Sequence, residues 1–128
     1  MPEQHRLVVA ALAAGVPIEA IQSHSHTISM PADLLGSGEH YALEVRGDSM
    51  IDAGIHDGDL LVVDRSVEAT DGKVVIVSVN GELTVKRLRR SKGKSWLLPE
   101  NPDYPPIALH EEDETHLWGV VTNVIHPL

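Results

Sequence analysis

The stretch KVVIVSVNGELTVKRL, residues 73–88, decides the fold. Two apolar runs rich in valine flank the dipeptide Asn80-Gly81. β-Branched residues favour extended strands. Asn-Gly is the dipeptide best suited to the two-residue turn of a β-hairpin, because both central residues of that turn need a positive φ. The stretch therefore predicts two antiparallel strands joined by a tight turn.

Short apolar runs of the same kind continue along the chain after residue 40. Turn-forming segments rich in Gly, Pro, Asp and Asn separate them, and Ser91–Lys94 predicts a second hairpin turn. The other runs are YALEV, DLLVVDR, SWLLP, PIAL and LWGVVTNVI. Apart from one turn after Ser49, no window has sustained helical periodicity. We expect a mostly β, compact single domain of short antiparallel strands and hairpins.

The two ends of the chain carry different signals. Residues 1–40 have weak periodicity and frequent turn formers, so we expect an irregular N-terminal arm there. Residues 41–128 hold the β-type runs and form the second unit. The last run, LWGVVTNVI, is apolar at nearly every position. That pattern suits a buried strand or an edge strand paired across a dimer.

Composition narrows the class of protein. A net charge of −9 disfavours direct binding of nucleic acid, and the absence of Phe leaves few aromatic rings for stacking bases. There is no Cys, which favours a reducing, intracellular compartment. The apolar run near the N-terminus is interrupted by Gly15, Pro17 and Glu19, so it is too short to span a membrane and does not indicate a signal peptide. We expect a cytoplasmic protein.

Ser49 is a candidate nucleophile, because it stands after a glycine at the end of an apolar alternating run. The hydrolase elbow G-x-S-x-G would need glycine where Ile51 stands. A Ser-His-Asp triad could use any of eight histidines, but its spacing cannot be read from sequence. Ser49 as a plain turn residue stays open as well.

Lys86 is the candidate base for Ser49, because a neutral lysine can activate a serine. It shares a strand face with Thr84, whose hydroxyl could hydrogen-bond the amine. Burial would lower the pKa of Lys86, and we expect the neighbouring arginines at 87, 89 and 90 to lower it further. The alternative is a solvated lysine on an edge strand.

Several separated motifs resemble the self-cleaving serine peptidases of the SOS response, which include LexA, UmuD and phage repressors. They are GDSMIDAGIHDGDLLVVDRS, NGELTVKRL, LLPENPDYPPI and WGVVTNVI, and the resemblance runs from Leu7 to Ile125. It implies a highly twisted LexA/signal-peptidase-like β fold with Ser49 as nucleophile and Lys86 as general base. It also implies oxyanion donors at the backbone of Asp48 and Ser49, with Met50 and Thr84 in support.

The resemblance also assigns a substrate. Family members cut their own chain between a small residue and glycine, and the bond Ala14-Gly15 resembles the Ala-Gly bond of LexA. The small side chain of Ala14 suits a tight pocket, and Gly15 allows a sharp bend. The apolar residues Leu7–Leu12 could lie beside the sheet as an added strand. The alternative is that ALAAG is only a packing segment of small residues.

The resemblance implies a set of partners and roles. It implies a homodimer, in which residues 41–128 form the catalytic and dimerisation domain, and stimulation by the RecA-nucleoprotein filament. The layout is that of an UmuD-like protein, an accessory of a translesion DNA polymerase. One alternative is the C-terminal domain of a LexA repressor, fused in the parent protein to a DNA-binding domain. A non-catalytic dimeric interaction module is an alternative of another class.

Other clusters are weaker. Asp57-Gly58-Asp59 with Asp52 lacks the ligand pattern of a calcium loop and reads as a turn. His24 and His26 share a strand face but are better explained as solvated residues than as a zinc pair. The basic run 86–94 and the acidic run 110–116 read as solvated segments, although the basic one could meet an acidic partner or a DNA backbone. We therefore expect neither a metal nor a cofactor.

Overall fold

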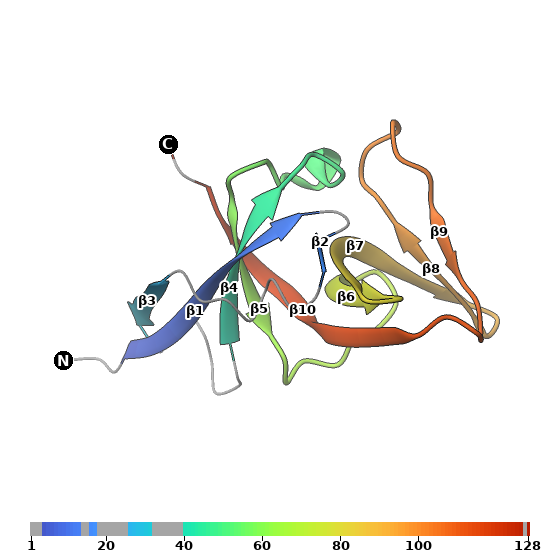
Figure 1. Ribbon diagram of the computed structural model, residues 1–128, viewed down its shortest axis with the longest axis horizontal. Helices are drawn as coiled ribbons and strands as arrows, with labels where there is room; N and C mark the ends of the chain where they lie inside the picture. The colour runs from blue at the N-terminus through green and yellow to red at the C-terminus, as the bar shows by residue number, and fades with distance from the viewer. Residues whose placement is uncertain (1–3, 14–15, 18–25, 32–39, 127) are drawn as a thin grey trace.

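The computed structural model describes residues 4–13, 16–17, 26–31, 40–126 and 128. In this part of the chain, ten strands form one sheet in the order β3-β1-β4-β5-β10-β6-β7-β8-β9, with β2 paired to β7 (Figure 1). Their bounds are β1 Gln4–Ala13, β2 Val16–Pro17, β3 His26–Pro31, β4 His40–Arg46, β5 Leu60–Asp64, β6 Val74–Val79, β7 Glu82–Ser91, β8 Lys94–Leu98, β9 Ile107–Leu109 and β10 Thr115–Ile125. All pairs are antiparallel except β1 with β4. The expected mostly antiparallel β fold is confirmed.

Both predicted hairpins are present. Asn80 and Gly81 have φ of 51° and 87°, and the turn joins β6 to β7 with Val79 opposite Glu82. The second turn joins β7 to β8 and again places two residues, Lys92 and Gly93, at positive φ. The left-handed backbone that these turns need is what Asn and Gly tolerate best.

β10 joins the two halves of the sheet. Its C-terminal half pairs with β5 and its N-terminal half with β6, and Val120 is in register with both strands. Gly119 lies at this change of partner, where an added Cβ would stand 2.6 Å from Val63 Cγ1. Only the centre of the strand is buried, so burial along its whole length is not observed. Leu117 and Val124 are 41% and 38% exposed.

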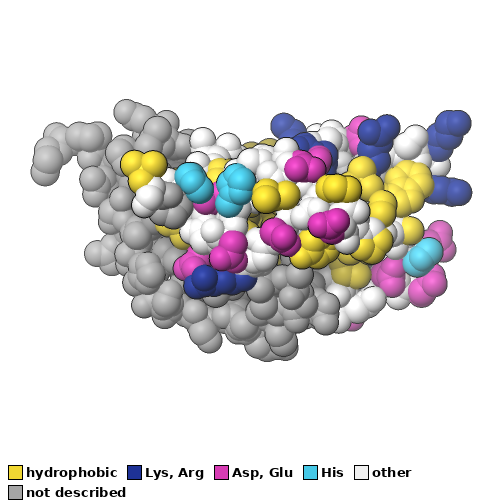
Figure 2. Space-filling model, turned by 90° about the horizontal axis from the view of Figure 1, so that it is seen from above, with side chains coloured by type: hydrophobic (Ala, Val, Ile, Leu, Met, Phe, Trp, Pro, Cys, Tyr) yellow, Lys and Arg dark blue, Asp and Glu magenta, His cyan; other side chains and the backbone are white. Residues whose placement is uncertain are grey.

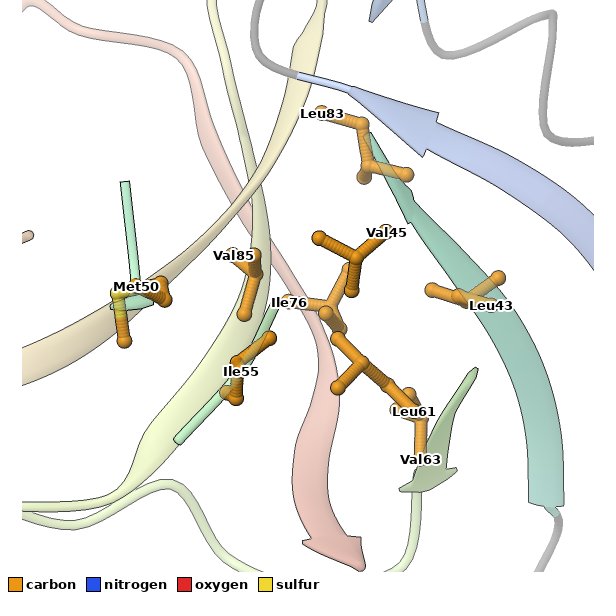
Figure 3. Close-up of a cluster of buried hydrophobic side chains, with 9 residues drawn as sticks. All are labelled: Leu43, Val45, Met50, Ile55, Leu61, Val63, Ile76, Leu83 and Val85. Carbon is orange, nitrogen blue, oxygen red and sulfur yellow. The ribbon is translucent and has the colours of Figure 1, made fainter. Parts of the chain in front are cut away.

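Two buried clusters lie on opposite faces of β6. Ile76 contributes to the larger cluster, whereas Val75 and Val77 contribute to the other. A strand buried on both faces reads as a continuous apolar run, which explains VVIV in the sequence. The larger cluster, shown in Figure 3, consists of Leu43, Val45, Met50, Ile55, Leu61, Val63, Ile76, Leu83 and Val85.

The described part of residues 1–40 is more regular than expected. β1 is ten residues long and pairs with β3 on one side and with β4 on the other. The expectation of an irregular arm is therefore wrong for these residues, whereas the added strand over Leu7–Leu12 is confirmed. Its parallel pairing with β4 joins segments distant in sequence, which weak local periodicity does not reveal. Among the described residues, no helix has the length and apolar character needed to cross a membrane.

Candidate functional site

Ser49 lies in the loop between β4 and a short 3₁₀ turn, η2, at Ile51–Ala53. Gly47 has a φ of 105°, which turns the chain out of β4. Met50, which follows Ser49 directly, is 1% exposed and packs in the larger cluster (Figure 3). The loop is therefore anchored on both sides of Ser49, by β4 before it and by a buried side chain after it.

Lys86 reaches Ser49 from β7. Its Nζ donates to Ser49 Oγ at 3.1 Å, to Thr84 Oγ1 at 2.8 Å and to the Val85 carbonyl at 3.1 Å. Lys86 is 5% exposed, and β7 is paired with β6 and β8. The alternative of a solvated lysine on an edge strand is therefore wrong. The structure brings Ser49, Lys86 and Thr84 together, as the sequence predicts.

The environment of the Lys86 amine is buried and neutral. Its three acceptors are two hydroxyls and a carbonyl, with no carboxylate among the described residues bonded to it. Burial lowers the pKa of Lys86 from 10.5 to about 8, because the ammonium form loses its hydration. Nearby arginines are not a cause of this shift. Arg87 is paired with Glu100 at 2.5 Å, so the expected contribution of the arginines is not supported.

A loop distant in sequence holds the Ser49 loop from outside. Asn101 Nδ2 donates to the Asp48 carbonyl at 2.8 Å, and the Tyr104 hydroxyl donates to the Asp48 carboxylate at 2.6 Å. The Glu100 N–H donates to the Ser49 carbonyl at 2.8 Å. In the sequence, NPDYPP stands out only as part of the resemblance motif LLPENPDYPPI, to which no role at the site is assigned. No local pattern indicates these contacts, which span more than fifty residues.

The backbone around Ser49 offers hydrogen-bond donors. Within the described ranges, the N–H groups of Asp48 and Ser49 donate to no acceptor. The carbonyls of the same two residues are both engaged, as acceptors from loop 100–104. This pattern leaves two unengaged N–H groups beside the Ser49 hydroxyl, which is what an anionic oxygen would need.

The predicted cleavage bond, Ala14-Gly15, lies outside the described residues. The strands on either side of it are described. Ala13, at the end of β1, is in register with Arg46 on β4. Val16, in β2, is in register with Leu83 on β7. The chain before the bond therefore lies beside β4, the strand that leads to Ser49, and the chain after it lies beside β7, the strand that carries Lys86.

The aspartates of the turn at residues 57–59 bond to nearby backbone N–H groups and to a histidine. Asp57 accepts a hydrogen bond from the Gly47 N–H at 2.8 Å, and buried Asp59 accepts one from the His56 N–H at the same distance. His126 Nδ1 lies 2.5 Å from the other oxygen of Asp59. These carboxylates organise a turn, as expected. Of the suggested zinc pair, His24 and the side chain of His26 lie outside the described residues.

The basic run forms the hairpin of β7 and β8. Figure 2 shows Lys and Arg side chains gathered at one end of the molecule, where Figure 1 places β8 and β9. Arg90 lies beside the acidic turn at Asp71, whose carboxylate accepts from the Arg90 N–H at 2.7 Å. Lys86 itself begins this run on β7 and bonds Ser49, and the other cations of the run are not among the described hydrogen-bond partners of the Lys86 amine.

A known protein family matches most of the chain. The model of the family described as Peptidase S24-like matches residues 7–122. The match covers most of the chain, including the Ser49 loop, β7 with Lys86, and the loop that contains Asn101.

Proposed function

The chain belongs to the Peptidase S24-like family, and from this premise we propose that it is a serine endopeptidase that cuts its own Ala14-Gly15 bond. Ser49 is the nucleophile and Lys86 the general base. One observation carries the proposal: buried Lys86, to which no carboxylate of the described residues is bonded, places its Nζ 3.1 Å from the Ser49 hydroxyl.

The reaction is an acyl transfer in two steps. The neutral Lys86 amine takes the Ser49 proton while Oγ attacks the carbonyl carbon of Ala14. The Lys86 ammonium then returns the proton to the departing amine of Gly15, which leaves an ester between Ala14 and Ser49. Water hydrolyses this ester with Lys86 acting again as base, and free Ser49 is restored.

The lowered pKa of Lys86 makes this chemistry feasible near neutrality. With a pKa of about 8, roughly one molecule in ten holds the neutral amine at pH 7. At the ordinary value of 10.5 the neutral fraction would be roughly one in three thousand. The Thr84 hydroxyl, 2.8 Å from Nζ, keeps the amine directed at Ser49.

The oxyanion of the tetrahedral intermediate takes its hydrogen bonds from the backbone. The N–H groups of Asp48 and Ser49 are the candidates, because neither has an acceptor among the described residues. Donors fixed in place before the reaction stabilise the developing charge without reorganising.

The arm is the proposed substrate because of the strands that flank the bond. Two residues, Ala14 and Gly15, lie between Ala13 and Val16, which pair with β4 and β7 respectively. The residues that flank this dipeptide are thus paired with the strand that leads to Ser49 and the strand that carries Lys86. On this view residues 1–40 are the arm and residues 41–128 the catalytic and dimerisation domain.

The cellular role follows the family resemblance. We propose a regulatory cleavage in the bacterial SOS response, stimulated by a RecA-nucleoprotein filament, in a protein of UmuD-like layout that assists a translesion polymerase. The alternative is the C-terminal domain of a LexA repressor. The exposed apolar residues Leu117 and Val124 on β10 favour a homodimer formed there, because each half of that strand has one side unused by β5 or β6.

Intact mass tests the activity. The purified chain is incubated at pH 7 to 10 and its mass followed with time, alone and with RecA on single-stranded DNA. Loss of the first fourteen residues by the wild type but not by Ser49→Ala supports the proposal. A stable mass under every condition would instead favour a dimeric interaction module with an idle Ser-Lys pair.

A further inference from the structure

Asn101 forms a hydrogen bond to the peptide group that joins Asp48 to Ser49 and carries the Ser49 N–H. Its Nδ2 donates to the Asp48 carbonyl at 2.8 Å, and its Oδ1 accepts from the Asp103 N–H at 2.9 Å. Asn101 is 9% exposed, so water has little access to compete for these bonds. Because both ends of the amide are engaged, the orientation of the side chain is fixed.

The hydrogen bond from Asn101 to the Asp48 carbonyl also fixes the direction of the Ser49 N–H. The two groups belong to one planar peptide unit, and in a trans unit they point in opposite directions. No cis peptide occurs in the described part of the chain. Since the carbonyl points towards Asn101, the N–H points away from loop 100–104. The Ile51 N–H also reaches this carbonyl, at 3.3 Å, so Asn101 makes the shorter bond.

The next peptide unit is held from the same loop. The Glu100 N–H donates to the Ser49 carbonyl at 2.8 Å, and the Glu100 carbonyl accepts from the Asp52 N–H at 2.8 Å. Both peptide units that flank Ser49 are therefore fixed by residues 100 and 101. Of these contacts only the bond from Asn101 comes from a side chain, so it alone can be removed by substitution.

We propose that Asn101 is a positioning residue that aims the Ser49 N–H at the oxyanion formed during acyl transfer. The inference rests on the proposed function. Loss of one oxyanion donor from a serine peptidase costs about 10²–10³-fold in rate. Asn101 orients the donor rather than supplying it, and Ile51 retains a weaker hold, so we expect a loss of about 10- to 100-fold.

The test measures self-cleavage by intact mass across pH 6 to 11, which separates the plateau rate from the pH midpoint. Asn101→Ala removes both hydrogen bonds of the side-chain amide, the one to the Asp48 carbonyl and the one from the Asp103 N–H. Asn101→Asp keeps the side-chain shape and the oxygen that accepts from the Asp103 N–H, but it loses the N–H group that donates to the Asp48 carbonyl. This variant replaces Asn101→Ala in the test if the alanine variant does not fold. Asn80→Asp is the matched control, because Asn80 also bonds in both directions, to Asp113 Oδ1 and from the Glu114 N–H, at a different turn.

The inference predicts that both Asn101 variants lose about 10- to 100-fold in plateau rate, with Asn80→Asp unchanged. The midpoint of Asn101→Ala should stay at the wild-type value, because the Lys86 amine keeps its surroundings. Plateau rates equal to the wild type overturn the inference. So does a midpoint of Asn101→Ala that moves towards that of a free lysine, which would mean that the whole site had loosened. A wild type that does not cut, or a Ser49→Ala variant that does, overturns the proposed function and this inference with it.

Discussion

Lys86 and Asp59 are both buried and ionisable, yet the surroundings of Asp59 stabilise its charged form and those of Lys86 destabilise it. Asp59 is 0% exposed, and burial alone would raise its pKa, but hydrogen bonds from the His56 N–H and His126 hold the pKa below its usual value. Lys86 is 5% exposed, its acceptors within the described part of the chain are all neutral, and burial lowers its pKa to about 8. One site stabilises its charge and the other does not.

The difference separates a structural charge from a reactive one. The Asp59 carboxylate holds a turn together, and its neighbours make the charged form the stable one. Burial destabilises the Lys86 ammonium relative to that of an exposed lysine, so a larger fraction of the amine is neutral near pH 7. Perturbed groups that lack a counter-charge are typical of catalytic sites, and here the group lies within hydrogen-bond distance of a serine hydroxyl.

The largest expected effect is the loss of the base. Lys86→Arg keeps a cation but cannot deprotonate in the accessible range, so we expect self-cleavage to fall by at least about 10⁴-fold at every pH. Lys92→Arg, at the tip of the β7–β8 hairpin, is the matched control and should cut at the wild-type rate. Intact mass against time measures both. Normal cutting by Lys86→Arg would remove Lys86 from the mechanism.

Neutralising the other buried charge should cost stability instead of activity. Asp59→Asn weakens the bonds to His56 and His126, and we expect the free energy of unfolding to drop by about 2 kcal/mol. Asp113→Asn is the control, because half-buried Asp113 accepts from the His110 N–H in the same way through a solvent-exposed hydrogen bond. Urea denaturation at pH 7 compares the two, and equal losses would contradict the assignment.

Acid should destabilise the protein by protonating the Asp59 carboxylate. Because the folded pKa of Asp59 is depressed, its contribution is complete above the unfolded value of 3.8 and is lost as pH falls through the folded value. The urea midpoint of the wild type should therefore drop steeply below about pH 4, and Asp59→Asn should drop less. Identical acid profiles would show that Asp59 does not contribute.

Removing the amine should relieve a cost. The shift of the Lys86 pKa from 10.5 to about 8 corresponds to about 3 kcal/mol against the charged form. This cost is complete below about pH 8 and is relieved as pH rises towards 10.5, so wild-type stability should rise across that window. Lys86→Met, which cannot titrate, should be about 1–2 kcal/mol more stable at pH 7 and lack the rise. Urea denaturation at pH 7 and pH 10 measures both effects, and a less stable variant that kept the rise would contradict them.

The smallest expected effect concerns Thr84. Its hydroxyl accepts from the Lys86 amine at 2.8 Å and stabilises the charged form. Thr84→Val should therefore lower the pKa of Lys86 further and move the pH midpoint of cleavage towards acid, while looser placement of the amine lowers the plateau about 3- to 10-fold. A midpoint that moved towards alkali would mean that the hydroxyl does not stabilise the ammonium.

The sequence predicts the hairpins well because their signals are local. Asn80-Gly81 contains everything that its turn requires, and the apolar run before it reflects burial on both faces of β6. β1 carries no such signal. Its partners, β3 and β4, are supplied by distant segments, and a strand that is satisfied by pairing need not alternate. For the described residues of the arm, the expectation of irregular structure is wrong for that reason.

The candidate site divides in the same way. The family resemblance implies Ser49 and Lys86 as a pair, which the structure places 3.1 Å apart, and strand periodicity places Thr84 beside the lysine. Asn101 and Tyr104 could not be found, because their contacts with Asp48 form only when loop 100–104 folds against the serine loop. The expected influence of Arg87 also failed, since proximity in sequence does not reveal its ion pair with Glu100.

The pH dependence of self-cleavage tests most directly whether Lys86 is the base. The first-order rate of loss of residues 1–14, followed by intact mass, is measured from pH 5 to pH 11. We predict a rate that rises about tenfold per pH unit at low pH and levels off above about 8, where the Lys86 amine is neutral. A plateau reached near 6.5, the ordinary pKa of a histidine, would contradict the account. A rate that still rises beyond 10.4, as expected of an exposed lysine, would contradict it equally.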